Sequence, residues 1–247
     1  MLWNHVGRVG SAVLALGLLA CDSTSTGRQG VGISFSTKAP GALLVAGAQS
    51  PSFAITMTNG ANTLVITKAQ LVLRELELKL SAATTCATGT TADSCERVQL
   101  GPSLVDLPVT ANVTTPFTAM VPAGTYQGIE FDIRRPGTDP LDAAFIAANP
   151  NFNNVSIRVE GTYNGVAFVF TSELDQEVKI TFNPPLVVTD ATNNATIAAD
   201  IKAWFTNADG TLINPATASP GGVNASIVGE KIKLSLRAFE DKDKSGS

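Results

Sequence analysis

The C-terminal residues form the nearest match to a metal-binding motif in the sequence. Asp241-Lys-Asp-Lys-Ser-Gly246 matches the first half of a calcium loop, in which acids two apart turn their oxygens inward and glycine permits the bend. Asp241, Asp243 and Ser245 would be the ligands, while the bidentate glutamate that completes such a loop is missing. The motif predicts either weak calcium binding or a solvated acidic and polar tail over residues 241–247.

Acidic side chains recur at alternate positions in two other segments. Glu130 and Asp132 would lie about 6.6 Å apart on one strand face, close to the spacing of a glycosidase carboxylate pair. They also alternate with apolar residues, as on any strand with one solvated face. Glu173, Asp175 and Glu177 would form an acidic row, which could supply oxygens to calcium or protect a sheet edge against aggregation.

Residues 1–20 are predicted to be a lipoprotein signal peptide. Arg8 supplies the positive start, and Val9–Ala20 is an apolar segment of about 12 residues, too short to span a membrane as a helix. Leu18-Leu-Ala-Cys21 resembles the lipobox of bacterial lipoproteins, whose cysteine is diacylated and becomes the first residue. Cys21 is therefore expected to anchor the protein to an inner or outer membrane of the bacterial cell envelope. An ordinary signal peptide with a coincidental cysteine is the alternative.

The mature chain is expected to lack histidine, because the single histidine, His5, lies within the predicted signal peptide. Such a chain cannot hold a Ser-His-Asp or Cys-His catalytic unit, or a zinc or copper site ligated by histidine. We therefore expect a non-catalytic binding, adhesion or structural module, whose partner is an envelope glycan or protein. A glycan-active enzyme or accessory subunit that uses carboxylates alone is the alternative.

Two cysteines follow the lipobox. Eight residues separate Cys86 from Cys95, and a disulfide is the default for such a pair in an exported protein. Closing this loop would contribute roughly 2–3 kcal/mol of stability in the chain-entropy model. A two-thiolate metal site or a reactive thiol pair is the alternative, but the spacing fits a CxxC motif poorly.

The composition indicates a compact, weakly charged and mildly acidic protein. Hydrophobic residues make up 44% of the chain and charged residues 15%, and removing Arg8 from the formal charge of −4 leaves −5. The chain is too apolar to be disordered, and the absence of basic runs argues against nucleic-acid binding. Residues 21–30 are polar and rich in Gly, Ser and Thr, as in a flexible tether. Residues 31–240 are expected to form one β-sandwich domain, with no cofactor other than weakly bound Ca²⁺.

Two Asn-Gly dipeptides, Asn59-Gly60 and Asn164-Gly165, predict β-hairpins with type I′ turns. Each turn fixes a register, and in both hairpins that register places apolar residues opposite apolar residues. The expected pairs are Ile55 with Leu64 in the first hairpin, and Tyr163 with Val166, Gly161 with Phe168 and Val159 with Phe170 in the second.

Alternating apolar residues predict further strands. Ile129–Ile133 has its odd positions inward, and strand faces are also expected within Ile197–Phe205 and Ile232–Ala238. The apolar phase changes within Gln70–Leu80. A β-bulge near Arg74-Glu75 would reconcile the two phases, and a short helix is the alternative.

One helix is expected at Pro140–Ala148, because Asp139 can cap it, Pro140 suits its first position and Pro150 can stop it. Trp204 falls on the outward side of the strand expected near it, where it could bind a ligand by stacking on a sugar ring or could anchor a partner. A loop that covers this indole is the alternative. Many short strands with one short helix indicate an all-β, antiparallel β-sandwich.

Several segments together resemble uncharacterised exported bacterial lipoproteins with a transthyretin-like or immunoglobulin-like β-sandwich. The resemblance implies a fold and an envelope location, and it brings no established activity. The segments that carry it are Val65–Leu78, Leu104–Pro108, Val121–Tyr126, Ile129–Ile133, Ala203–Phe205, Asp209–Ala216 and Ala238–Asp243.

Overall fold

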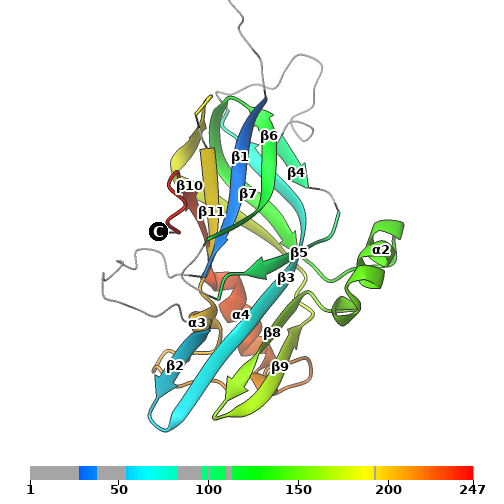
Figure 1. Cartoon of the computed structure of the whole chain (residues 1–247), viewed down its shortest axis with the longest axis vertical. Coiled ribbons are helices and arrows are strands. Elements are labelled where there is room, and N and C mark those ends of the chain that lie inside the picture. Colours follow the sequence, from blue (N-terminus) through cyan, green and yellow to red (C-terminus); the bar gives the residue numbers. More distant parts are fainter. Residues whose placement is uncertain are drawn as a thin grey trace, which may run out of the picture.

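The computed structural model describes residues 28–37, 54–82, 96–99, 101–109, 113–191 and 193–246. This part of the chain is mostly β-structure arranged in two sheets, with few helices (Figure 1). The expected all-β sandwich is therefore confirmed. None of the helices among these residues is long and apolar enough to cross a membrane.

The smaller sheet has four strands in the order β12-β11-β1-β6. Its pairs are antiparallel, as predicted, except that β1 runs parallel to β11. The strands are β1 (Arg28–Ser36), β6 (Thr114–Pro122), β11 (Asn193–Ala199) and β12 (Leu236–Glu240).

The larger sheet has eight strands built along β3 (Asn62–Leu80), a strand of 19 residues. One edge of β3 pairs with β2, β5 and β4, and its other edge pairs with β8 and β7. β9 continues the sheet beyond β8, and β10 continues it beyond β7. The bounds are β2 (Ile55–Asn59), β4 (Arg97–Gln99), β5 (Ser103–Leu107), β7 (Gly124–Ile133), β8 (Ile157–Tyr163), β9 (Val166–Ser172) and β10 (Gln176–Val188).

β3 divides the molecule into two ends. At the sandwich end, the smaller sheet lies against the C-terminal half of β3 and against β7 and β10. At the hairpin end, the β2–β3 and β8–β9 hairpins are backed by helices and loops of the chain after residue 200 (Figure 1). The rings of Phe170 on β9 and Phe205 meet edge to face there, with centroids 5.2 Å apart. One apolar cluster runs through both ends.

The β8–β9 hairpin has the expected register, with Gly161 opposite Phe168. Asn164 and Gly165 both have positive φ, as a type I′ turn requires. In the β2–β3 hairpin, the predicted pairing of Ile55 with Leu64 is wrong, because Ile55 pairs with Ile66. The turn residues there are Gly60 and Ala61, and Asn59 belongs to the strand. Since the shift is two residues, the inward face is unchanged.

The predicted β-bulge in the middle of β3 is confirmed. Glu75 has a φ of 49°, and the pairing with β7 shifts between Arg74 and Glu77. The extra residue returns Leu76 and Leu78 to the same inward face as Leu71 and Leu73.

Helix α2 (Pro140–Ala148) has the predicted bounds, and the Asp139 side chain accepts a hydrogen bond from the Asp142 amide as its cap. Its buried Phe145 packs with Phe152 and Val72, so α2 covers part of the outer face of β3. Phe152 belongs to the 3₁₀ turn η1 (Pro150–Phe152).

Two predicted strands are partly helical. β11 ends at Ala199, and Asp200 caps α3 (Ile201–Trp204) by accepting a hydrogen bond from the Ala203 amide. Residues 232–235 belong to α4 (Ala225–Ser235), and β12 begins only at Leu236. The buried residues of α4, Val228, Ile232 and Ser235, follow helical spacing, whereas Leu234 is exposed although the strand prediction placed it inward.

Candidate functional site

The two ends of the C-terminal acidic motif, Asp241 and Gly246, are buried in the fold, while residues 242–244 between them are exposed. Asp241 is only 3% exposed, and its carboxylate accepts hydrogen bonds from the backbone amides of Ser245 and Gly246, each at 2.9 Å. The Thr196 hydroxyl donates a third hydrogen bond at 2.7 Å. Both oxygens of Asp241 therefore already accept hydrogen bonds from donors of the protein.

This loop covers buried polar groups on the outer face of the smaller sheet. The Asn194 amide donates to the Asp241 carbonyl at 3.0 Å and accepts from the Ser34 hydroxyl at 2.7 Å. The Ser36 hydroxyl donates to the carbonyl of Gly246. The acidic motif thus joins the chain after β12 to β1 and β11.

The structure brings the three predicted calcium ligands together, because the Ser245 amide donates to Asp241 at 2.9 Å and to Asp243 at 3.1 Å, but no further described acidic side chain joins them. The pKa of Asp243 is lowered because its carboxylate is hydrogen-bonded to the Asp241 carboxyl and to Ser245. The possible additional ligands lie in ion pairs elsewhere, Glu173 with Arg135 and Asp175 with Arg134, each at 2.9 Å. Among the described residues, no three His, Cys, Asp or Glu side chains are placed to hold a metal ion.

Glu130 and Asp132 lie on the outer face of β7 at the sandwich end, as predicted. Glu130 is 3.6 Å from the Lys179 ammonium, and Asp132 is 3.8 Å from the Arg134 guanidinium. Burial raises the pKa of Asp132, and Arg134 opposes that rise. The face therefore carries a carboxyl that takes up a proton more readily than usual, two residues from a second carboxylate.

A hollow of about 280 Å³ lies beside Glu130. Lys79, Glu130 and Lys179 line it, around Gly128 on β7. Lys79 is also paired with Glu77 and Glu96, so charged groups on this face neutralise one another in pairs.

Trp204 is a core residue, which corrects the prediction that its indole faces outward to bind a ligand. It is 0% exposed, and its Nε1–H donates to the Ser235 hydroxyl at 2.7 Å. That hydroxyl donates to the Ile232 carbonyl. Because residues 201–204 turn into α3, the indole packs against α4 and does not emerge from a strand.

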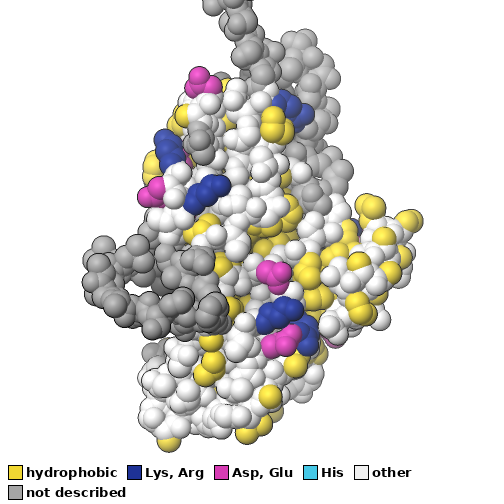
Figure 2. All heavy atoms as spheres, viewed as in Figure 1, with side chains coloured by type: hydrophobic (Ala, Val, Ile, Leu, Met, Phe, Trp, Pro, Cys, Tyr) yellow, Lys and Arg dark blue, Asp and Glu magenta, His cyan; other side chains and the backbone are white. Residues whose placement is uncertain are grey.

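The outer face of the hairpin end is uncharged over much of its area, and we call it the threonine face. Figure 2 shows no Lys, Arg, Asp or Glu over the tip of the two hairpins, where polar and scattered hydrophobic side chains cover the surface. The register of β2, β3, β8 and β9 places its members on one side of the sheet. They are Thr56, Thr58, Thr63, Val65, Thr67, Thr162, Ala167 and Val169.

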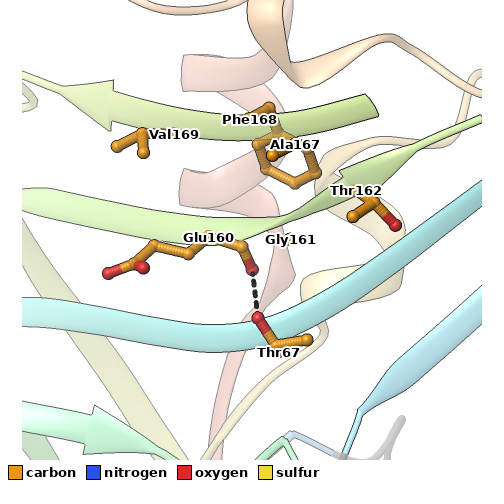
Figure 3. Close-up of a pocket in the computed structure, with 7 residues that line it drawn as sticks. All are labelled: Thr67, Glu160, Gly161, Thr162, Ala167, Phe168 and Val169. Carbon is orange, nitrogen blue, oxygen red and sulfur yellow. Dashed lines mark hydrogen bonds between the residues drawn. The ribbon is translucent and has the colours of Figure 1, made fainter. Parts of the chain in front are cut away.

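A hollow of about 330 Å³ lies in the threonine face (Figure 3). Its seven lining residues are Thr67, Glu160, Gly161, Thr162, Ala167, Phe168 and Val169. Thr67 is the extra residue of a bulge in β3, and its hydroxyl donates to the Glu160 carbonyl at 3.3 Å. A Cβ on Gly161 would lie 1.9 Å from the Val65 carbonyl oxygen, so only glycine permits the close approach of β3 and β8.

No pattern in the sequence predicted this hollow. The Asn164-Gly165 turn predicted the β8–β9 register, which places Thr162 and Ala167 on one face, but the bulge at Thr67 has no local signal. The alternate threonines at 56, 58 and 63 were a usable indication of a solvated sheet face.

Comparisons with known proteins show no family for this chain. No protein-family model matches it, and no curated protein matches it in sequence. Among solved structures, MbnP from Methylosinus trichosporium is similar at 10% identity and a TM-score of 0.40, covering 86% of this chain and 98% of that chain. That likeness is too distant to support an argument about function.

The predicted lipidation site Cys21 and the predicted disulfide partners Cys86 and Cys95 lie outside the described residues. The lipid anchor, the disulfide and the resemblance to envelope lipoproteins therefore stay predictions from the sequence.

Proposed function

We propose that this protein is a lipid-anchored, non-catalytic binding module of the bacterial cell envelope that contacts its partner through the threonine face. The observation that carries the proposal is the contrast between the two outer faces. The carboxylates at the sandwich end are held in ion pairs, whereas the threonine face is mostly uncharged and is hollowed beside Gly161, where Glu160, the one charged residue of the lining, pairs with Arg158. An anchor at Cys21 is supported by the lipobox pattern.

A polypeptide suits the threonine face better than a sugar. Sugar rings are commonly bound by exposed aromatic side chains, but the single aromatic residue that lines the hollow, Phe168, is 7% exposed. The threonine hydroxyls both donate and accept hydrogen bonds, and the valines add apolar area without charge.

The binding proposal is tested by cross-linking in native envelopes followed by quantitative mass spectrometry. Thr162→Arg would fill the hollow, and Thr118→Arg places the same change on exposed β6 as a matched control. We expect a cross-linked partner with the wild type and the control, and a loss of at least tenfold with Thr162→Arg. Equal recovery with all three proteins would contradict a role for the threonine face.

The anchor is tested separately. Cys21→Ser is expected to release the protein from the membrane fraction, because the thiol is the predicted site of acylation. Co-sedimentation of this variant with membranes after a carbonate wash would contradict the lipid anchor. The same preparations test the disulfide, since Cys86 and Cys95 should react with a maleimide only after reduction.

A carboxylate-only enzyme is the second candidate, and the raised pKa of Asp132 beside Glu130 favours it. In that case Asp132 would donate a proton to a glycosidic oxygen, and Glu130 would be the second carboxyl group of the pair. Hydrolysis of envelope glycan by the wild type that is lost in both Asp132→Asn and Glu130→Gln would support the enzyme. Glycan-dependent thermal stabilisation without turnover would support binding.

A further inference from the structure

The free edge of β9 carries backbone groups without partners among the described residues. The two-residue turn at Asn164-Gly165 makes Tyr163 and Val166 a hydrogen-bonded pair, so the backbone amides and carbonyls of the odd residues of β8 face β9 and those of the even residues face β3. On β9 the amides and carbonyls of even residues therefore face β8, and those of Ala167, Val169 and Thr171 face away from it. The Thr171 amide donates to the Ser219 hydroxyl at 3.1 Å. Ala167 and Val169 are left as the open positions of this edge.

Other edges in the described part of the chain carry residues that discourage pairing. β10 contains Glu177, Lys179 and a proline pair, β12 contains Arg237 and Glu240, and β6 contains Pro116. The edge of β2 contains no such residue, but Asn59 donates a hydrogen bond to the Gly210 carbonyl, so a loop covers it.

β9 has the sequence Val-Ala-Phe-Val-Phe-Thr-Ser, with neither charge nor proline. Val166 is 71% exposed and Val169 is 50% exposed. An exposed, uncharged, β-branched edge of this kind is a template for another strand.

We propose that β9 pairs antiparallel with β9 of a second copy of this chain. The open groups match a two-fold arrangement centred on Phe168. In it, Ala167 of one copy faces Val169 of the other, and each facing pair exchanges two hydrogen bonds. All four open residues of the two edges are then satisfied. A shifted register is restricted at both ends of the edge. Ser219 already bonds to the Thr171 amide at one end, and the Asn164-Gly165 turn ends the strand at the other.

This inference rests on the proposed function in one respect: it takes the partner that the hairpin end contacts to be a second copy of this chain. The two-fold axis of an antiparallel edge pair is normal to the sheet. β1 begins at the end of the molecule opposite the β8–β9 hairpin (Figure 1). The first residues of β1 in the two copies therefore lie at opposite ends of the dimer. Because the predicted anchor precedes β1, pairing would join two copies that are anchored to two surfaces facing each other.

Sedimentation velocity of the full chain carrying Cys21→Ser tests the pairing without a lipid. We expect a concentration-dependent dimer, and a monomer at the same concentrations for Val169→Pro. The Val169 amide does not bond to β8, so proline removes an edge donor without breaking the β8–β9 ladder. Val169→Thr should dimerise like the wild type. A wild type that stays monomeric, or a Val169→Pro variant that dimerises equally well, would overturn the proposal.

A second substitution keeps the test decisive if Val169→Pro folds poorly. Val169→Lys places a charge on the β9 edge, and Val187→Lys places the same charge on β10 at a matched exposure of 48% against 50%. We expect loss of the dimer with Val169→Lys alone. Equal association of both variants would contradict pairing through β9, whereas a failure of the Thr162→Arg or Cys21→Ser tests would leave this result unchanged.

Discussion

The two ends of the molecule share β3 and differ in what covers it and in what its outer face carries. At the sandwich end β3 is covered by a second sheet, and its outer face carries Glu77 and Lys79 in ion pairs. At the hairpin end helices back the sheet, and the outer face carries threonine and valine. Charged residues discourage another strand from pairing with a sheet edge, whereas an open edge without charge can accept one.

The largest expected effect is at the helical cover of the hairpin end. Trp204→Ala removes a fully buried indole and its hydrogen bond to Ser235, and it should lower the free energy of unfolding by about 3–5 kcal/mol. Urea denaturation followed by circular dichroism measures this.

A milder change at the sandwich end is Tyr126→Phe. It removes only the hydroxyl that donates to the Pro122 carbonyl at 2.8 Å. It should cost about 1 kcal/mol. A similar loss for the two variants would show that α3 and α4 do not hold the hairpin end together.

The next effect concerns the junction between the ends, where α2 is attached to β3. Arg74 donates from Nη1 to both carboxylate oxygens of the buried Asp142, at 2.8 and 2.9 Å. Arg74→Met should cost about 2–3 kcal/mol, because it leaves a buried carboxylate without its cation. Arg135→Met, which breaks an exposed pair with Glu173, should cost less than about 1 kcal/mol. Equal costs in thermal denaturation would argue against this account of the α2 attachment.

Asp241→Asn tests the polar loop that covers the smaller sheet. An amide cannot accept at both positions that the carboxylate occupies, so we expect a loss of about 1–2 kcal/mol. Because donors of the protein occupy both oxygens, millimolar Ca²⁺ should leave the melting temperature of the wild type unchanged. A calcium-dependent rise in the wild type that both Asp241→Asn and Asp243→Asn abolish would establish the metal site instead.

The smallest expected effect is a difference in pH dependence between the two ends. Burial raises the folded-state pKa of Asp132, so its ionisation destabilises the fold as pH rises from the unfolded value of about 3.9 through the folded one. Asp132→Asn should remove that loss. The pKa of Asp209 is lowered by its hydrogen bonds from Thr211, so its contribution is lost as pH falls. Denaturation midpoints for Asp132→Asn and Asp209→Asn across this range should therefore deviate from the wild type in opposite directions.

Local sequence signals predicted the parts of the fold that turn conformation, apolar alternation and helix capping determine without long-range contacts. The Asn164-Gly165 turn fixed the β8–β9 register, the phase change near Glu75 indicated a bulge, and Asp139 with Pro140 marked the start of α2. Residues 201–205 and 232–236 were ambiguous, because their short apolar alternation suits a strand and also one buried helix face. Tertiary packing, with the Asp200 cap, decided for helix.

The candidate sites were harder to predict because they depend on contacts that the sequence does not locate. The Asp241 loop is held by Thr196, which lies 45 residues earlier. Trp204 is buried because residues 201–204 are helical. The open edge at Val169 follows from β9 being the last strand on its side of the sheet, and no local pattern indicates which strand that will be.

The position of β1 has a mechanical consequence. It lies between β6 and β11 inside the smaller sheet, and Arg28, its first residue, follows the predicted anchor Cys21 by seven positions. A force applied through the predicted anchor along β1 acts across the hydrogen bonds to both neighbours, which are perpendicular to the strand toward β6 and slanted toward the parallel β11. Those bonds are loaded together in shear and cannot be unzipped one at a time. With an anchor at Cys21, β1 would therefore resist being pulled out of the smaller sheet.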